Sequence, residues 1–426
     1  MSNAATELLA HIVGLAIASR QGRSPERVLA VSSSVAVSTA SLSVMAVLFL
    51  MMAGANLPTA LYDVYRVRFT MSSLATTQLY AFYALIVLIG LPIFGRLSDR
   101  FGRRPLLLVG LCFAAGAAFC FATAASVPSL FAGRLLQGLS VGLVSGTGTA
   151  ALAELQVDRG GGASAATLAM VSGSAVGPLA GGAMATFGPW PEVLPFVVLA
   201  ALLVPAGLWV WRSVPAGLGN RTARACSRVG ERRPPSPRLT AQFWLACAAA
   251  FTAFEVPAVF MSIGPISVAQ AAGLHGPLVG GSVAFVLMGC SALVQVGFRP
   301  ASSKVAMAVG TVLLATGLCG FAAGVGSGNL AVIVAATAVA GFGQGLAFTG
   351  SVSVVNFLAP PRSRGLVTSL FYVAIYLGGG GPVVALGAGA VTFGTTAALN
   401  AFAAVVAASG VVIVCLLARR DFEGVH

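Results

Sequence analysis

The sequence predicts an all-α integral membrane protein that crosses the bilayer twelve times. Of its 426 residues, 58% are hydrophobic and only 8% are charged, which leaves too little polar surface to coat a soluble globule. Apolar runs of about 20 residues, the length that spans a bilayer, recur twelve times along the chain. They form two groups of six, separated by a polar interruption.

The twelve expected spans follow the chain in order. Those of the first group are residues 44–65, 76–95, 105–125, 130–152, 166–188 and 193–211. Those of the second group are residues 241–265, 278–297, 305–324, 330–350, 366–390 and 395–418. Because the number of spans is even, both termini lie on the same side of the membrane.

The basic residues indicate which side this is. With both termini inside, 21 of the 24 Lys and Arg residues fall in the cytoplasm, whereas Arg66 and Arg68 lie outside and Arg134 lies within a span. Cytoplasmic loops of membrane proteins carry this excess of positive charge. We therefore expect a multi-pass protein of the inner (plasma) membrane with cytoplasmic termini. The net charge of +13 then reflects topology, and no nucleic-acid partner is expected.

A basic, proline-rich segment divides the chain into two halves. Residues 221–238 hold six arginines and three prolines, a helix-poor composition that predicts a linker. The expected organisation is an N-terminal cytoplasmic tail (1–43), a six-helix half (44–212), a basic cytoplasmic linker (213–240), a second six-helix half (241–418) and a C-terminal tail (419–426).

The two halves look like degenerate copies of each other. Gln137-Gly138 in the fourth span and Gln344-Gly345 in the tenth are each followed, one span later, by a proline in a glycine-rich segment. Paired halves of this kind are typical of transporters, with the binding site near the midplane between them.

Charge is concentrated in ten residues between the second and third expected spans. Gly95 to Arg104 follow the pattern Gly-x-Leu-Ser-Asp-Arg-x-Gly-Arg-Arg. Charge this dense cannot enter hydrocarbon, so we expect a tight loop at the membrane surface. The pattern resembles the signature loop of the major facilitator superfamily of secondary transporters. In that family the loop locks and releases the cytoplasmic gate, which implies a gating role for Gly95, Asp99, Arg100, Gly102, Arg103 and Arg104.

The fourth span carries a charged motif. Arg134 and Gln137, three residues apart, share one helical face and precede Gly138. This stretch resembles the Arg-x-x-Gln-Gly motif of the superfamily, in which the arginine is associated with proton coupling. A charge in hydrocarbon is costly, so we expect Arg134 to face a cavity or a partner. The alternative is that Arg134 snorkels to the outer surface while Gln137 bridges two helices.

The fifth span combines glycines with a proline. Its pattern contains Gly173, Gly177, Pro178, Gly181 and Gly182. It resembles the antiporter motif of the drug:proton exchangers in the superfamily, although Ser164 stands where the longer form of the motif has a glycine. Generic close packing of helices through small residues, without any bearing on export, is the alternative.

Glu255 is the acid, among eleven in the chain, that lies in the middle of an expected span. Thr252, Phe254 and Pro257 beside it suggest a helix that faces a cavity. An apolar setting favours the protonated carboxyl, which suits reversible proton binding. We expect Glu255 to bind the coupling proton, a cationic substrate, or both in competition. The alternative is a permanently protonated acid that is hydrogen-bonded to a neighbouring helix.

Other polar side chains are candidates for lining the substrate cavity, although each alone more often joins helices. They are Asn56, Tyr80, Tyr83, Gln295, Gln344, Tyr372 and Tyr376. Asn56 is neutral, whereas some drug exporters of the superfamily carry an acid in the middle of this helix. Asp63 and Glu154, near span ends, are expected at the membrane interface.

The sequence offers no signature of an enzyme. It contains no Gly-x-x-x-x-Gly-Lys-Ser/Thr phosphate loop, and its three histidines and seven cysteines lack metal-ligand spacing. We therefore expect no catalytic activity, no cofactor and no metal.

The resemblance covers roughly residues 44–418 and implies two pseudo-symmetric six-helix bundles that rock about a central site. We expect a monomeric secondary active transporter that exports a drug-like molecule or a metabolite in exchange for protons, by alternating access. Its partners would be the small-molecule substrate, protons and the lipid bilayer. A sugar or metabolite carrier, proton-coupled or passive, and a non-transporting membrane receptor or assembly subunit of the same fold are the alternatives.

Overall fold

A computed structural model describes residues 25–156, 162–219, 239–273, 276–298, 302–359 and 364–420. Side chains are described from Thr39 onward, except at a few positions within the helices. Throughout these ranges the regular structure is helical. The expected linker lies outside the described residues from 220 to 238, as do tail residues 1–24 and 421–426.

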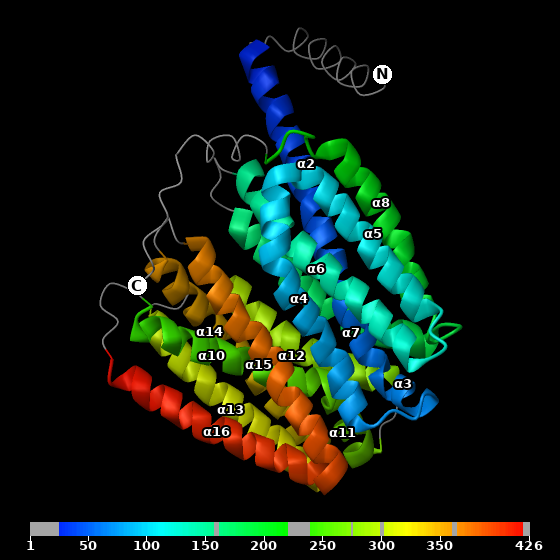
Figure 1. Ribbon diagram of the computed structural model, residues 1–426, viewed down its shortest axis with the longest axis vertical. Coiled ribbons are helices and arrows are strands. Elements are labelled where there is room, and N and C mark those ends of the chain that lie inside the picture. Colours follow the sequence, from blue (N-terminus) through cyan, green and yellow to red (C-terminus); the bar gives the residue numbers. More distant parts are fainter. Residues whose placement is uncertain are drawn as a thin grey trace.

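The first half of the chain folds into long helices joined by short turns (Figure 1). In order these are α2 (Pro25–Asn56), the 3₁₀ helix η1 (Leu57–Leu61), α3 (Tyr62–Arg68), α4 (Ser73–Phe101), α5 (Arg103–Ala122), α6 (Val127–Leu155), α7 (Gly162–Phe187) and α8 (Leu194–Ser213).

The second half repeats this pattern. Its helices are α10 (Ala241–Ser262), α11 (Gly264–Ala272), α12 (Pro277–Gly297), α13 (Ser303–Ser327), α14 (Leu330–Leu358), α15 (Arg364–Phe393) and α16 (Thr395–Ala418).

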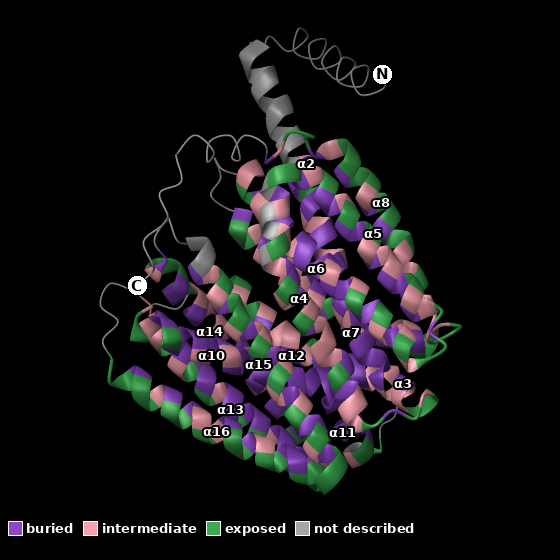
Figure 2. Cartoon of the chain, in the orientation of Figure 1, coloured by how far each residue is buried: buried purple, intermediate pink, exposed green. Residues whose placement is uncertain are grey.

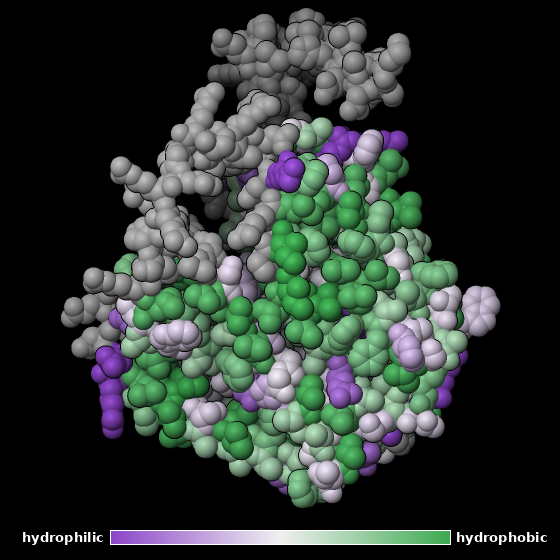
Figure 3. Space-filling model, viewed as in Figure 1, coloured by the Kyte–Doolittle hydropathy of each residue, from purple (hydrophilic) through white to green (hydrophobic). Residues whose placement is uncertain are grey.

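The described residues contain 12 helical segments that are long and apolar enough to cross a membrane, and each overlaps one of the expected spans. The prediction of an all-α protein with twelve spans is therefore confirmed. Over the helices, the face seen in Figure 3 is mostly hydrophobic, as a surface in contact with lipid requires.

The first span is not one continuous α-helix. It runs from Thr39 to Arg68 and consists of the end of α2, η1 and α3. Pro58 stands second in η1 and has no N–H to donate to the preceding turn. The backbone tightens into a 3₁₀ turn there, and two carbonyl groups at the end of α2 lose a helical partner.

The charged stretch from Gly95 to Arg104 differs from the expected loop. Helix α4 continues through this stretch as far as Phe101, and α5 begins at Arg103. The reversal takes place at Gly102 alone, which has φ 87°. The end of the apolar run marks where the chain leaves the hydrocarbon. The leucine, serine and arginine residues that follow are compatible with a helix, which therefore continues until Gly102 permits a backbone with positive φ.

The two halves have separate hydrophobic cores and meet along two seams. One core is built from α2 to α8 and the other, in two parts, from α10 to α16. Across the seams, α7 packs on α12 and α4 packs on α15. Figure 2 shows buried residues concentrated around α7, α12 and α11, and exposed residues along the outer sides of α8 and α16.

Candidate functional site

Arg134 is buried in the first half and lies 1% exposed near the start of α6. Its Nη1 donates to the carbonyl of Ala55 at 2.9 Å and to Oε1 of Gln137 at 2.8 Å. Its Nη2 donates to the hydroxyl of Tyr62. Among the described residues these partners are all neutral. Arg134 therefore does not snorkel to the surface; it faces partners inside the protein, the first of the two alternatives.

Arg134 and Gln137 bond to the carbonyl groups that Pro58 leaves without a partner. In an α-helix the N–H of residue 58 would bond to Gly54, and in a 3₁₀ turn to Ala55. Proline offers neither bond. Instead, Nε2 of Gln137 donates to the carbonyl of Gly54 at 2.8 Å, and Nη1 of Arg134 donates to the carbonyl of Ala55. The motif in α6 thereby completes the hydrogen bonding of the broken first span, and Gln137 does bridge two helices.

Aromatic rings surround the guanidinium group. The centres of the rings of Tyr62, Tyr83 and Phe121 lie 5.3, 5.6 and 5.8 Å from its Cζ atom. Cation–π attraction adds to the neutral hydrogen bonds in holding a charge inside the protein. Tyr62 and Phe121 were not among the predicted site residues. The position of Tyr62, four residues after a membrane-embedded proline, is the signal that could have suggested it.

The glycines of α7 form its contacts with α2 and η1. A Cβ at Gly173 or Gly177 would collide with the backbone of α2, and one at Gly181 would lie 2.9 Å from Leu57. Pro178 lies within α7, between two of these glycines. The expected motif therefore acts here as a close-packing surface.

The same helix joins the halves at the end of the molecule that carries α3 and α11. A Cβ at Gly182 would meet the backbone at Pro277 and Leu278, and one at Gly281 would meet the carbonyl of Pro178. The N–H of Leu278 donates to Oγ1 of Thr186 at 3.1 Å. On the other seam, Gly387 of α15 packs against Thr77, near the start of α4. These contacts hold the halves together at that end.

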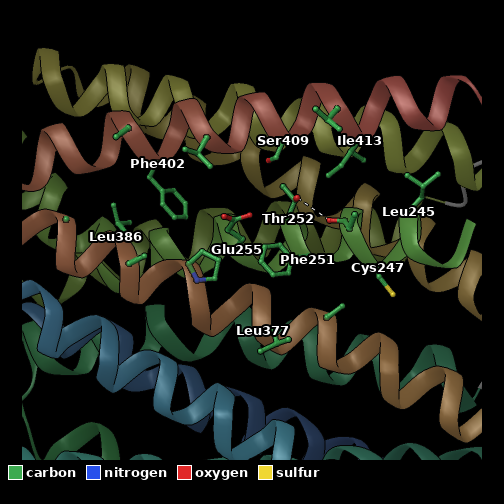
Figure 4. A pocket seen from close by; sticks show the side chains of 18 of the residues that line it. Leu245, Cys247, Phe251, Thr252, Glu255, Leu377, Leu386, Phe402, Ser409 and Ile413 are labelled. Carbon is green, nitrogen blue, oxygen red and sulfur yellow. Dashed lines mark hydrogen bonds between the residues drawn. The ribbon is translucent and has the colours of Figure 1, made fainter. Parts of the chain in front are cut away.

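Glu255 lies in α10 and is 7% exposed. Its side chain lines an open cavity of about 1160 Å³ between α10, α15 and α16, within the second half. Figure 4 shows Glu255 and Thr252 on the α10 side of this cavity, with Phe402 and Ser409 of α16 opposite them. The helix does face a cavity, as its sequence suggested, but the cavity lies inside one half and not between the two.

The carboxyl group of Glu255 has no hydrogen bond or ion pair to any described residue. Thr252 donates to the carbonyl of Ala248 at 3.2 Å, and Ser409 to that of Val406 at 2.9 Å, so both nearby hydroxyls bond within their own helices. The alternative of an acid hydrogen-bonded to a neighbouring helix therefore has no support among these residues.

The other three acids whose side chains are described all form ion pairs. Asp63 pairs with Arg66 at 3.1 Å, Glu154 pairs with Arg103 at 3.0 Å, and Glu192 pairs with Arg68. Each pair lies near a helix end. Glu255 is thus set apart both by its depth and by its lack of a partner.

The remaining polar candidates lie in three separate places. Asn56 donates to the carbonyl of Met52 at 2.9 Å and to Ser174 at 3.4 Å, between α2 and α7. Gln344 accepts from Ser291, which in turn accepts from Gln295 at 2.8 Å, between α14 and α12.

Two tyrosines of α15 and two of α4 complete the set. The rings of Tyr372 and Tyr376 have centroids 6.4 Å apart, and Tyr376 packs against the cores of both halves. Tyr80 of α4 reaches across to Met261 of α10, with 4.0 Å between its hydroxyl and the sulfur. Tyr80 and Tyr376 therefore lie where the halves meet, whereas Glu255 does not.

The charged segment around Gly102 is anchored within the first half. Arg103, 6% exposed, pairs with Glu154 of α6, and its backbone N–H donates to the carbonyl of Leu218 at 3.0 Å. Arg104 stacks on the ring of Trp211 at 4.1 Å, whereas Arg100 is exposed. The surroundings of Gly95 and the side chain of Asp99 lie outside the described part of the chain.

This arrangement of twelve spans in two halves has a counterpart among known proteins. A family model described as Major Facilitator Superfamily matches residues 39–381, which is most of the chain. The chain belongs to this superfamily. It is a membrane transporter and not an enzyme, and the resemblance seen in the sequence is confirmed.

Curated relatives within the superfamily match part of the chain. The tetracycline resistance protein, class C, of Escherichia coli is 32% identical over 161 residues, which is 37% of this chain and 36% of that protein. The multidrug efflux pump LfrA of Mycolicibacterium smegmatis is 36% identical over 151 residues, 31% of this chain and 29% of that protein. The matched segments thus span about a third of each relative.

Solved structures match over nearly the whole length. A POT family transporter in complex with 5-aminolevulinic acid has a TM-score of 0.72 at 11% identity and covers 90% of this chain and 96% of its own. The human organic anion transporter TETRAN has a TM-score of 0.62 at 18% identity and covers 93% of this chain and 100% of its own. At these identities the likeness concerns the fold alone.

Proposed function

We propose that this transporter exports a small hydrophobic molecule across the inner membrane in exchange for protons, and that Glu255 takes up the proton. The observation that carries the proposal is a carboxyl group 7% exposed inside the membrane, without an ion-pair or hydrogen-bond partner among the described residues. A titratable group in a membrane-embedded cavity is a functional candidate for physical reasons, because its charged form is costly there.

The cost of the bare carboxylate supplies the coupling. An ionised carboxyl group without partners in an apolar cavity is unstable, so it takes up either a proton or a cation. The two occupants neutralise the same charge and therefore exclude each other. Because α15 separates this cavity from the place where the halves meet, the proposal requires α15 to move when the halves rock, so that Glu255 is exposed to each side in turn. Competition at this one group then exchanges a proton entering for a substrate leaving.

We assign the end that carries Gly102 to the cytoplasm, because cytoplasmic loops are enriched in arginine. The contacts of Gly182 and Gly281 then close the outer side. They are made between small residues and backbone, which permits the halves to separate there with little repacking. Rocking about the two seams would open the outer side and close the inner one.

The names of the relatives agree with export. One matched protein is a tetracycline resistance protein and another a multidrug efflux pump. The cavity beside Glu255 is lined almost entirely by apolar side chains, which favours hydrophobic substrates over sugars.

Arg134 has a different role in this proposal. Two of its hydrogen bonds go to neutral groups of the first span, one of them a carbonyl freed by Pro58, and a third goes to Gln137 of its own helix. We assign it a positioning role, which keeps the broken first span in shape while the halves move.

The test uses inside-out membrane vesicles with an imposed proton gradient. Dyes, antibiotics, amines and sugars are added in turn, and the collapse of the gradient is followed by a pH-sensitive dye. We expect hydrophobic compounds to collapse the gradient in the native protein and not in Glu255→Gln. Glu192→Gln serves as the matched control, because it removes the same charge from an exposed ion pair of small energetic weight.

If no compound disturbs the gradient in either protein, proton exchange is refuted. Collapse caused by sugars alone would favour the sugar carrier instead. A collapse of the gradient that persists unchanged in Glu255→Gln would show that Glu255 does not bind the exchanged proton.

A further inference from the structure

The cavity that contains Glu255 is separated from the first half of the protein. Helix α15 stands between them: Gly378 packs against the backbone of Phe251 in α10, while Gly380, two residues along, packs against Ala81 and Ala84 in α4. Figure 4 shows the same order, with α4 beyond α15 and the cavity on the other side. The cavity is therefore distinct from the place where the two halves meet.

The cavity opens toward the surface that faces lipid. Its lining includes exposed apolar side chains on each of its three helices, among them Trp244 of α10, Leu377 of α15 and Val405 of α16, which are 56%, 51% and 64% exposed. Exposed apolar side chains of a spanning helix contact the hydrocarbon. A molecule dissolved in the bilayer can therefore reach Glu255 without passing through water.

The lining combines aromatic rings with a single carboxyl group. Phe251, Phe393 and Phe402 contribute rings, and the hydroxyls of Thr252 and Ser409 already donate within their own helices. Aromatic faces attract cations, and a carboxylate attracts them more strongly. A bound cation would supply the partner that the carboxyl group lacks.

The volume fits a ligand of drug size. About 1160 Å³ lies just above the range of about 300 to 1,000 Å³ that is usual for small-molecule sites. Such a space accommodates several aromatic rings around one charge.

We infer that this lateral cavity is a binding site for lipophilic monocations that enter it from the hydrocarbon core, with Glu255 as the counter-charge. The inference deepens the proposed function and rests on it for the ionisation of Glu255. It adds the class of ligand, the route of access and a site inside the second half alone.

The test measures binding without any gradient. The purified protein is placed in lipid nanodiscs and titrated with radiolabelled tetraphenylphosphonium, a cation that cannot lose its charge, and with triphenylphosphine oxide, a neutral molecule of similar shape. We expect saturable binding of the cation at least tenfold tighter than that of the neutral compound. In Glu255→Gln this preference is lost.

A second variant tests the place of binding. Ala401→Phe puts a ring into the cavity from α16, and we expect it to weaken binding of the cation at least tenfold. Ala404→Phe is the matched control, since Ala404 is exposed on the same helix and does not line the cavity. Both positions are exposed alanines, so neither change disturbs the core.

The route of access is tested with brominated phospholipids in the nanodiscs. A fluorescent lipophilic cation, rhodamine 6G, bound at a site open to lipid is quenched by bromine on the acyl chains, and Ala401→Phe should abolish the saturable part of this quenching. A bound dye that bromine does not quench would overturn access from the membrane.

The outcomes separate this inference from the proposed function. If cation and neutral compound bind equally, or if Glu255→Gln and Ala401→Phe change nothing, the lateral site is overturned even where the vesicles show proton exchange. If the cation binds through Glu255 and no compound moves protons, the site stands and the exchange fails.

Discussion

Each half of the molecule buries an ionisable side chain within its spans, and the surroundings of these two side chains differ. Arg134 in the first half has hydrogen bonds to Ala55, Gln137 and Tyr62, and three aromatic rings around it. Glu255 in the second half has no such partner among the described residues and faces an apolar cavity. Both Nη atoms of Arg134 are hydrogen-bonded, although its Nε has no partner among the described residues. A charge held by several hydrogen bonds stabilises a structure, whereas a carboxyl group without any leaves a group ready to bind.

The corresponding helices α6 and α14 differ at the position of Arg134. Gln137-Gly138 matches Gln344-Gly345, but the position of Arg134 is taken by Gly341. A Cβ at Gly341 would meet the carbonyl of Leu287 and lie 2.9 Å from Cys290, so α14 approaches α12 there. In the first half, α6 is joined to α2 by the hydrogen bonds of Arg134 and Gln137. At the corresponding position in the second half, α14 and α12 pack closely together.

The largest expected effect on stability follows the loss of the buried guanidinium group of Arg134. Arg134→Met leaves the carbonyl of Ala55 and the amide of Gln137 with fewer partners inside the membrane. We expect the free energy of unfolding to fall by about 3 kcal/mol, measured by thermal unfolding in detergent. Arg104→Met, which removes a cation–π contact at a helix end, should cost less than about 1 kcal/mol. Equal losses in the two variants would contradict the structural role of Arg134.

The close contact in the second half should come next. Gly341→Ala forces α14 away from α12, and overpacking of this kind costs about 2 kcal/mol. Gly289→Ala in α12 is the control, because a Cβ there meets nothing within 4 Å. The same thermal measurement applies, and a Gly341→Ala protein as stable as the control would show that the two helices do not pack as described.

The two matched glutamines sharpen the comparison further. Gln344→Leu removes the acceptor of Ser291 and should cost about 1 kcal/mol. Gln137→Leu removes the donor to the carbonyl of Gly54 and the acceptor of Arg134. We therefore expect the free energy of unfolding to fall by about 2 kcal/mol. Urea or detergent titration of both variants measures the difference. If the order were reversed, the second half would hold the stronger polar network.

The smallest effect on stability is expected where the effect on transport is greatest. Glu255→Gln removes no hydrogen bond or ion pair among the described residues, so the free energy of unfolding should stay within about 0.5 kcal/mol of the native value. Thermal unfolding checks this alongside the vesicle assay. A loss comparable to that of Arg134→Met would reveal a partner for the carboxyl group and remove the contrast between the halves.

The spans were predictable from sequence because hydrocarbon imposes a length and a composition on every helix that crosses it. The distance that a helix continues beyond the membrane could not be predicted in this way. At Gly95 to Arg104 the charges mark the edge of the hydrocarbon, whereas the helix ends only at Gly102.

The direction of Glu255 could not be read from the sequence either. Helix α10 is apolar on nearly every side and almost wholly buried, so it has no polar face to indicate which way a side chain points. For Arg134 the missing information was the partner. The signal was present in Pro58, since a proline within a span leaves carbonyl groups that another helix must satisfy.

The break at Pro58 has a consequence for the order in which the protein is assembled. The first span enters the membrane with two carbonyl groups that its own backbone cannot pair, and such groups are costly in hydrocarbon. Their donors lie in the fourth span; Gln137 follows Gly54 by 83 residues. The first helix can therefore reach its final shape only after the fourth has been synthesised and inserted.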